Sequence, residues 1–146
     1  MPEAATHRAS APLVPTQIQT FSKTADRERL NSVALKAFIT LSERWTLTGT
    51  ESAALLGVSE STWDRIKRGT WGQPLSQDQM TRASAAIGLY KGLRLIFADE
   101  ISDRWPKLPN SGTLFQRKSP IEMMIDGGIP AMLEVRRYID AVRGGL

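Results

Sequence analysis

The sequence predicts an all-α fold. Apolar residues recur at helical spacing in several segments, and no segment alternates convincingly between apolar and polar residues as a half-buried strand does. Clusters of Pro, Gly and Ser separate these segments. The chain has 146 residues, of which 41% are hydrophobic, enough to bury one modest core. We therefore expect a small helical protein, with an N-terminal helical bundle over residues 23–100 and a smaller helical domain over residues 101–146.

Residues 1–22 are expected to form a flexible N-terminal arm. They are rich in Pro, Ala, Thr, Ser and Gln and show no 3.6-residue period. Such a segment cannot bury enough apolar surface to offset the entropy lost on ordering. The first helix is expected from Thr24 onward, because apolar residues there recur at positions i, i+3, i+4 and i+7. We expect that face to contain Leu30, Val33, Ala34, Ala37, Phe38 and Leu41.

The segment from Thr50 to Gly69 fits a helix-turn-helix position by position. Ala53 is small where two helices would cross, and Leu56 fills the space between them. Gly57 can supply the left-handed backbone conformation of the sharp turn. The second helix would then begin after a capping Ser59, with Trp63 and Ile66 facing inward.

The outward face of that second helix is predicted to contact DNA. Ser61, Thr62 and Arg65 would reach base edges in the major groove, while basic and hydroxyl side chains nearby would contact phosphates. The full set of predicted DNA contacts is Thr48, Thr50, Ser59, Ser61, Thr62, Arg65, Lys67 and Arg68. Glu60 and Asp64 weaken the binding expected of one copy, which favours a dimer on two half-sites. The alternative is a plain helical hairpin whose basic residues are a solvated face.

The next helix is expected to open at Ser76, with Gln79 completing a capping box, and to run through Phe97. Gly88 and Gly92 lie four apart in it, which indicates either the close approach of another helix or a bend. Residues 105–112 carry two prolines and a glycine and are expected to form a loop. A capping box over Ser119–Glu122 predicts a short helix that stops at Gly127–Gly128, and Pro130 opens the last helix.

Charge and composition exclude several classes of function. The formal net charge is +4 and the sequence pI is near 9.8, a balance that favours an anionic partner. With no cysteine and one histidine, disulfides, Cys/His zinc sites and His-dependent triads are excluded, and no metal or cofactor is expected. No apolar run approaches the roughly 20 residues needed to cross a bilayer, and no secretory signal is visible. We expect a cytoplasmic protein that does not bind a membrane.

The C-terminal third resembles the toxin-binding domain of the Xre/MbcA/ParS antitoxins. The residues that carry the resemblance are, in order, Trp105, Pro109–Asn110, Lys118–Glu122, Asp126–Gly128 and Val135–Ile139. The helix-turn-helix is similar to the Xre-like half of the same proteins, so the resemblance spans roughly residues 24–146. One departure is Arg117, which stands where many relatives have Gly.

The resemblance implies a non-enzymatic type II antitoxin paired with a cognate RES-domain toxin. That toxin would have an ADP-ribosyltransferase-like fold and would consume NAD or transfer from it. The antitoxin's C-terminal region would cover the toxin's active site, and its helix-turn-helix would bind operator DNA and repress its own operon. A homodimer within a hetero-oligomeric toxin–antitoxin complex is expected.

The last helix offers a physical basis for docking on a toxin. Its apolar residues, including Ile129, Leu133 and Val142, exceed the number that one core-facing stripe requires. Arginines can bind carboxylates with a planar fork of donors. We predict toxin contacts at Met132, Arg136, Arg137, Tyr138, Asp140, Arg143, Gly144, Gly145 and Leu146. Ordinary core packing and a solvated surface explain the same residues without a partner.

Two other classes of function remain open from the residues alone. A stand-alone dimeric helix-turn-helix transcription regulator would use the same DNA contacts and would use the last helices for dimerisation. An enzyme would have to rely on Glu122 and Asp126, four apart on one helix face. Glu122 is better explained by the capping box, and no phosphate loop accompanies the pair, so catalysis is not expected.

Overall fold

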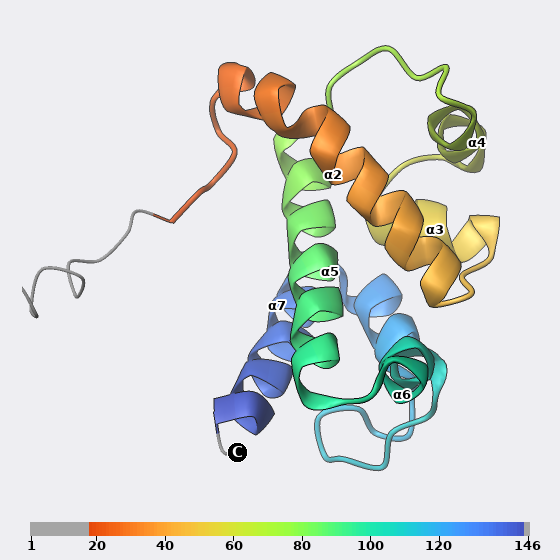
Figure 1. The fold of residues 1–146 in the computed structure, drawn as a ribbon, viewed down its shortest axis with the longest axis vertical. Coiled ribbons are helices and arrows are strands. Elements are labelled where there is room, and N and C mark those ends of the chain that lie inside the picture. The colour runs from red at the N-terminus through yellow and green to blue at the C-terminus, as the bar shows by residue number, and fades with distance from the viewer. Residues whose placement is uncertain (1–17, 145–146) are drawn as a thin grey trace, which may run out of the picture.

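The computed structural model describes residues 18–144, and within them every regular element is helical (Figure 1). The all-α prediction is confirmed. None of the helices in this part of the chain is long and apolar enough to cross a membrane. The elements in chain order are α2 (Thr24–Arg44), α3 (Gly49–Leu56), α4 (Glu60–Arg68), α5 (Gln77–Ile96), α6 (Asp99–Arg104), the 3-10 helix η2 (Trp105–Lys107) and α7 (Pro120–Gly144).

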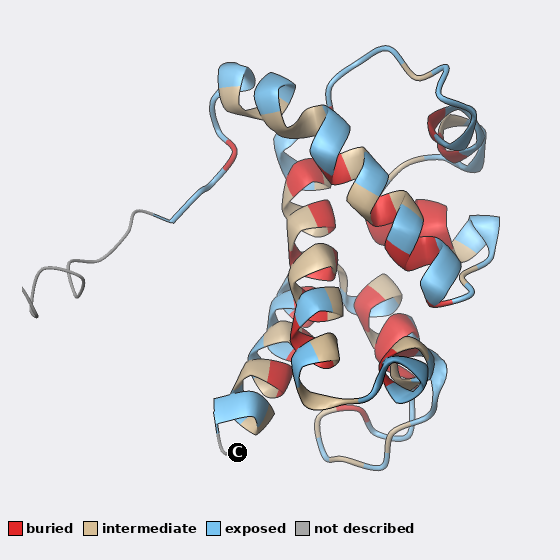
Figure 2. Cartoon of the chain, in the orientation of Figure 1, coloured by how far each residue is buried: buried red, intermediate tan, exposed pale blue. Residues whose placement is uncertain are grey.

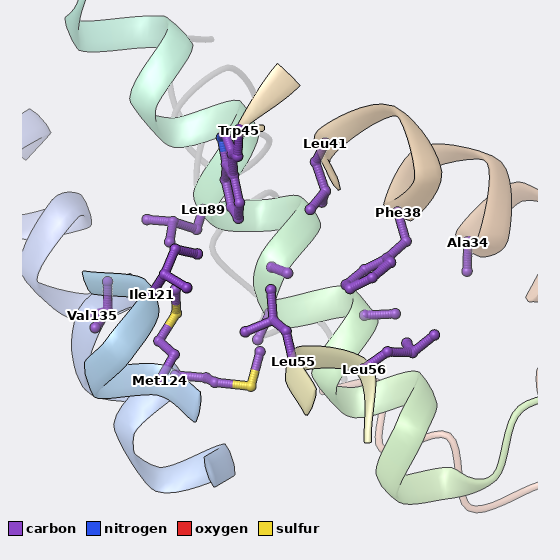
Figure 3. Close-up of a cluster of buried hydrophobic side chains, with 14 of the residues drawn as sticks. Ala34, Phe38, Leu41, Trp45, Leu55, Leu56, Leu89, Ile121, Met124 and Val135 are labelled. Atoms are coloured by element: carbon purple, nitrogen blue, oxygen red, sulfur yellow. The ribbon is translucent and has the colours of Figure 1, made fainter. Parts of the chain in front are cut away.

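Helix α5 is the centre of the molecule, with α2 crossing it on one side and α7 packed along the other (Figure 1). The buried residues line the surfaces where these helices face one another, and the outer surfaces are exposed (Figure 2). Phe38 and Leu41 from α2, Leu55 from α3, Leu89 from α5 and Met124 from α7 meet in one cluster (Figure 3). Both halves of the chain therefore share a single hydrophobic core, and the expected domain boundary at residue 100 lies within α6.

The buried face of α2 agrees only in part with the expected one: Leu35 and Ile39 also pack against the core, and one expected residue is exposed. Ala34, Phe38 and Leu41 are buried as predicted, but Val33 is 68% exposed. Neighbouring helical residues are rotated by about 100° around the axis. With Ala34 and Phe38 against α5, Val33 is turned to the rim of a groove that it lines with Phe21 and Ile87.

The end of the predicted arm is fixed to the body. Phe21 is buried, and its carbonyl accepts a 2.7 Å hydrogen bond from Nη1 of Arg27. Gln77, at the start of α5, donates from Nε2 to the carbonyl of Thr20 at 3.0 Å. Thr20 and Phe21, which lie within the expected arm, therefore contact the body, and residues 1–17 lie outside the described part of the chain.

The two glycines of α5 face α7, which confirms close helix approach as their role. A Cβ added at Gly92 would lie 3.2 Å from Cγ2 of Ile139, and one at Gly88 would overlap the guanidinium of Arg136. The predicted capping box is also present, because Ser76 and Gln79 exchange hydrogen bonds of 2.9 and 3.1 Å between side chain and backbone.

The region after α5 contains two short elements that the sequence did not predict. Phe97 is extended (φ −125°, ψ 152°), so α5 ends at Ile96 and α6 starts three residues later, at Asp99. Arg94 stabilises this corner by pairing with Asp99 at 3.0 Å and with Asp103 at 2.8 Å. The first three residues of the expected 105–112 loop form η2 instead.

Helix α7 has the two segments that the sequence predicts. Ser119 and Glu122 form the capping box at its start, with hydrogen bonds of 3.0 and 3.1 Å. Gly128 has non-helical angles (φ 65°, ψ −153°) and divides the helix before Pro130. Just upstream, Arg117 has φ 71°, the left-handed conformation that glycine adopts most easily. The residue that departs from the family pattern therefore holds a conformation that would suit the expected Gly.

Candidate functional site

The turn between α3 and α4 has the geometry of a helix-turn-helix. Gly57 is left-handed (φ 80°, ψ 35°), as predicted, and closes α3 by donating to the carbonyl of Ala53 at 2.8 Å. Val58 donates to the same carbonyl at 3.0 Å and packs against the core. The backbone angle favours glycine, and a Cβ on Gly57 would lie 3.0 Å from Cδ of Arg82, so that side chain would have to shift.

The orientation of α4 is fixed by its cap and by two buried residues. The hydroxyl of Ser59 accepts a 3.1 Å hydrogen bond from the backbone N–H of Thr62. Trp63 and Ile66 are buried, and the Trp63 ring meets Phe38 of α2 edge-on at 5.5 Å. The cap at Ser59 and the inward positions of Trp63 and Ile66 are as predicted, and they turn the opposite face of α4 outward.

The outward face of α4 brings together several of the predicted DNA contacts. Ser61, Asp64, Arg65 and Arg68 are all exposed and follow the i, i+3, i+4, i+7 spacing of one helix face. Lys67 lies off this stripe, where it lines a small cavity beside α2 and α3. The outward stripe therefore carries two arginines, a hydroxyl and one carboxylate.

Arg65 is held by two neighbours rather than extended freely into solvent. Its Nη2 donates to the hydroxyl of Thr62 at 3.3 Å. Its guanidinium carbon lies 5.0 Å from the centre of the Trp71 ring. The sequence did not single out Trp71 as a functional residue. The one local signal is its position two residues after Gly69, the glycine that ends α4.

The two threonines predicted to face phosphate have partners at the start of α3. Thr48 caps the helix, and its hydroxyl accepts from the backbone N–H of Glu51 at 3.0 Å. The hydroxyl of Thr50 donates to Oε1 of Glu60 at 2.8 Å. Lys107 of η2 lies at the same end of α3, with Nζ 3.3 Å from Oε1 of Glu51.

Opposing effects set the charge state of Glu51. Burial raises the pKa of its carboxyl, but hydrogen bonds from Thr48 and the adjacent Lys107 ammonium outweigh burial, so the pKa lies below its ordinary value. The carboxylate form is thus favoured where the capping box needs an acceptor.

The predicted toxin contacts on α7 divide into buried and exposed residues. Met132 is 0% exposed, so its prediction as a surface contact is wrong: together with Val135 and Ile139 it forms the stripe that packs into the core. Tyr138 is half-buried, stacked on Trp105 at 6.3 Å and edge-on to Phe115 at 5.1 Å.

The rest of the α7 set lies at the surface in local ion pairs. Arg137 pairs with Glu134, and Asp140 lies between Arg136 at 3.7 Å and Arg143 at 3.6 Å. Leu133 lies beside them and is 44% exposed. It is the clearest remnant of the apolar surface of α7 that was expected to stay free for a partner. Gly144 is the last described residue, and the predicted contacts at Gly145 and Leu146 fall outside the described part of the chain.

The two carboxylates considered for catalysis are each engaged elsewhere. Glu122 accepts from the backbone N–H of Ser119 in the capping box at 3.0 Å. Asp126 pairs with Lys118 at 3.1 Å. The capping hydrogen bond and the ion pair therefore account for the positions of both carboxylates.

Comparison with known proteins decides the family. Residues 24–87 match the model of the antitoxin Xre-like helix-turn-helix domain. The uncharacterized protein y4oB of Sinorhizobium fredii is 34% identical over 113 residues, which are 76% of this chain and 84% of that protein. The chain belongs to the Xre-like helix-turn-helix antitoxins. In this Xre-like antitoxin the matched residues contain all of α2, α3 and α4 and end within α5, so they include the capped turn and the outward stripe described above.

Proposed function

We propose that this Xre-like antitoxin binds operator DNA by placing α4 in the major groove. The observation that carries the proposal is the outward stripe of α4, fixed by the Gly57 turn and by Trp63 and Ile66 beneath it. The N-terminal residues of a recognition helix contact base edges in this arrangement. Ser61 and Arg65 are assigned to bases, and Arg68 to a phosphate.

Phosphate contacts on the flanks complete the proposed interface. Thr48 and Thr50 lie at the start of α3. Lys67 of α4 lines the small cavity beside α2 and α3. Asp64 is on the stripe and Glu60 beside it, which weakens the binding of a single copy. We therefore propose that a homodimer binds two half-sites about one helical turn apart, or a multiple of that spacing.

We propose in addition that the C-terminal region neutralises a cognate RES-domain toxin that uses NAD. The resemblance of residues 105–139 to the toxin-binding domain of the Xre/MbcA/ParS antitoxins supports this role. Exposed Leu133 and the arginines Arg137 and Arg143 offer an apolar contact beside carboxylate-binding forks. Covering the toxin's NAD pocket with the end of α7 would make the antitoxin an inhibitor, and the complex would repress its own operon.

DNA binding is tested by titrating a labelled duplex from the promoter upstream of the chain's own gene. Arg65→Ala should cost about 1 to 3 kcal/mol of binding free energy and relax the sequence preference at one position of each half-site. Lys67→Ala should weaken all sequences alike and reduce the salt slope by about one unit. Arg104→Ala, on α6 and away from α4, is the matched control. Unchanged promoter affinity in a folded Arg65→Ala variant would contradict the base-reading assignment.

Toxin binding is tested by co-expressing the chain with the product of the neighbouring reading frame. Co-purification of a protein whose NAD consumption is suppressed in the complex is the expected result. If the neighbour does not bind while the chain still binds its promoter, a stand-alone dimeric regulator is the better description.

A further inference from the structure

We propose that Trp71 is a positioning residue for Arg65, holding the guanidinium in the orientation that reads a base. The proposal rests on the proposed operator binding and goes beyond it by assigning a role to a residue outside the helix-turn-helix. The observation that carries it is the guanidinium of Arg65 lying 5.0 Å from the Trp71 ring centre while it donates to Thr62.

The backbone after α4 explains how the indole reaches Arg65. Gly69 ends the helix in the left-handed conformation (φ 76°). Thr70 then turns back, and both its backbone N–H and its hydroxyl donate to the carbonyl of Arg65, at 2.9 and 3.3 Å. The next residue is Trp71, so this turn brings the ring beside the Arg65 side chain.

The indole is itself held by packing. It is half-buried against the core and lines a groove with Leu35, Ile39 and Ile66. Its Nε1 is buried and has no hydrogen-bond partner within residues 18–144. Packing against the hydrophobic core is therefore what holds the ring in place. A ring anchored to α2 and α4 can therefore limit the rotamers of Arg65.

An aromatic face is suited to holding an arginine that must still bind a base. A carboxylate partner would occupy the planar fork of N–H donors, whereas an indole attracts the face of the guanidinium and leaves the edge donors free. Helical side chains lean toward the N-terminus, and Thr62 fixes the guanidinium one turn in that direction. Because Thr62 and Trp71 hold the side chain, Arg65 loses less rotamer entropy when its remaining donors bind a base.

The test is a double-mutant cycle on the labelled promoter duplex, with a duplex of shuffled sequence as the reference. Trp71→Leu should weaken promoter binding about two- to fivefold, the strength of an exposed cation–π contact, and leave shuffled-duplex binding unchanged. Trp71→Phe, which keeps an aromatic face, should lose less. In an Arg65→Ala background, Trp71→Leu should have no further effect, because Trp71 affects DNA binding only through Arg65.

Three outcomes would overturn the proposal. One is unchanged promoter affinity in Trp71→Leu. Another is an equal loss with and without Arg65, which would mean that Trp71 acts on the fold. The last is an equal loss on promoter and shuffled duplexes. If Trp71→Leu strongly lowers the thermal midpoint, the test rests on Trp71→Phe. Its loss of promoter affinity should then disappear in the Arg65→Ala background, and a loss that persists there would overturn the proposal. An Arg65→Ala variant with wild-type affinity would instead contradict base reading itself.

Discussion

Lys107 and Glu51 join the C-terminal half of the chain to the first helix of the helix-turn-helix. Nζ of Lys107 lies 3.3 Å from Oε1 of Glu51, the same oxygen that accepts the backbone N–H of Thr48 at 2.9 Å. Lys107 also donates to the carbonyl of Thr46 at 2.9 Å. One carboxylate therefore completes the cap of α3 and anchors η2 beside it.

Removing Lys107 should destabilise the whole fold modestly. Lys107→Ala is expected to lower the free energy of unfolding by about 1 kcal/mol, the upper range for partly exposed ion pairs. A urea titration measures the change. Lys118→Ala is the matched control, because its ion pair with Asp126 is more exposed and should contribute close to nothing. Equal losses in the two variants would contradict a special role for the Lys107 contact.

Stability should depend on pH through Glu51. Its pKa is lower in the folded chain than its ordinary value of 4.5, so its contribution is present above that value and is lost as the pH falls through the folded pKa. Glu51→Gln should therefore flatten the loss of stability below about pH 5. Thermal midpoints between pH 3 and 7 test this, with the exposed Glu43→Gln as control. A slope unchanged by Glu51→Gln would show that the acid sensitivity arises elsewhere.

The turn of the helix-turn-helix should be sensitive to the loss of glycine. Gly57→Ala forces a Cβ into a left-handed conformation and against Arg82, and should cost about 1 to 2 kcal/mol or more. Gly72→Ala, where a new Cβ meets nothing within 4 Å, should be near neutral or slightly stabilising. Denaturant midpoints compare the pair, and similar values would argue against the strained turn.

Arg117→Gly should stabilise the chain. Arg117 holds a φ of 71°, a conformation that costs a non-glycine residue about 1 to 2 kcal/mol. Glycine removes that strain but loses more backbone entropy on folding, so a net gain of roughly 0.5 to 1 kcal/mol is expected. Differential scanning calorimetry would measure it. A lower midpoint in Arg117→Gly would mean that the arginine side chain contributes more than its backbone strain costs.

The features that the sequence predicted correctly depend on close neighbours in the chain. The caps at Ser76 and Ser119 and the turn at Gly57 each involve residues within about four positions of one another, so their patterns are visible in the sequence. For Gly88 and Gly92 the sequence left a close helix approach and a bend open, and their contacts with α7 decide for the close approach.

The features that the sequence did not predict depend on tertiary geometry. Lys107 and Glu51 are far apart in the chain, and no local pattern links them. Met132 was predicted at the surface because α7 has more apolar residues than one stripe needs, and only packing against α5 decides which of them are buried. The exposure of Val33 was likewise not predictable, because the packing of α2 against α5 decides which apolar residues of α2 are buried. The break at Phe97 was missed because the apolar period continues through it.

Truncation at the C-terminus tests most directly whether DNA binding and neutralisation reside on separate surfaces. A chain ending at Ile139 keeps the buried stripe of α7 but loses Asp140 and Arg143, along with the last residues. This truncated chain should bind the promoter duplex with wild-type affinity but should no longer inhibit NAD consumption by the co-expressed neighbour, with circular dichroism showing an intact fold. Full inhibition by the truncated chain would contradict this expectation and would place neutralisation on another surface, such as residues 105–112.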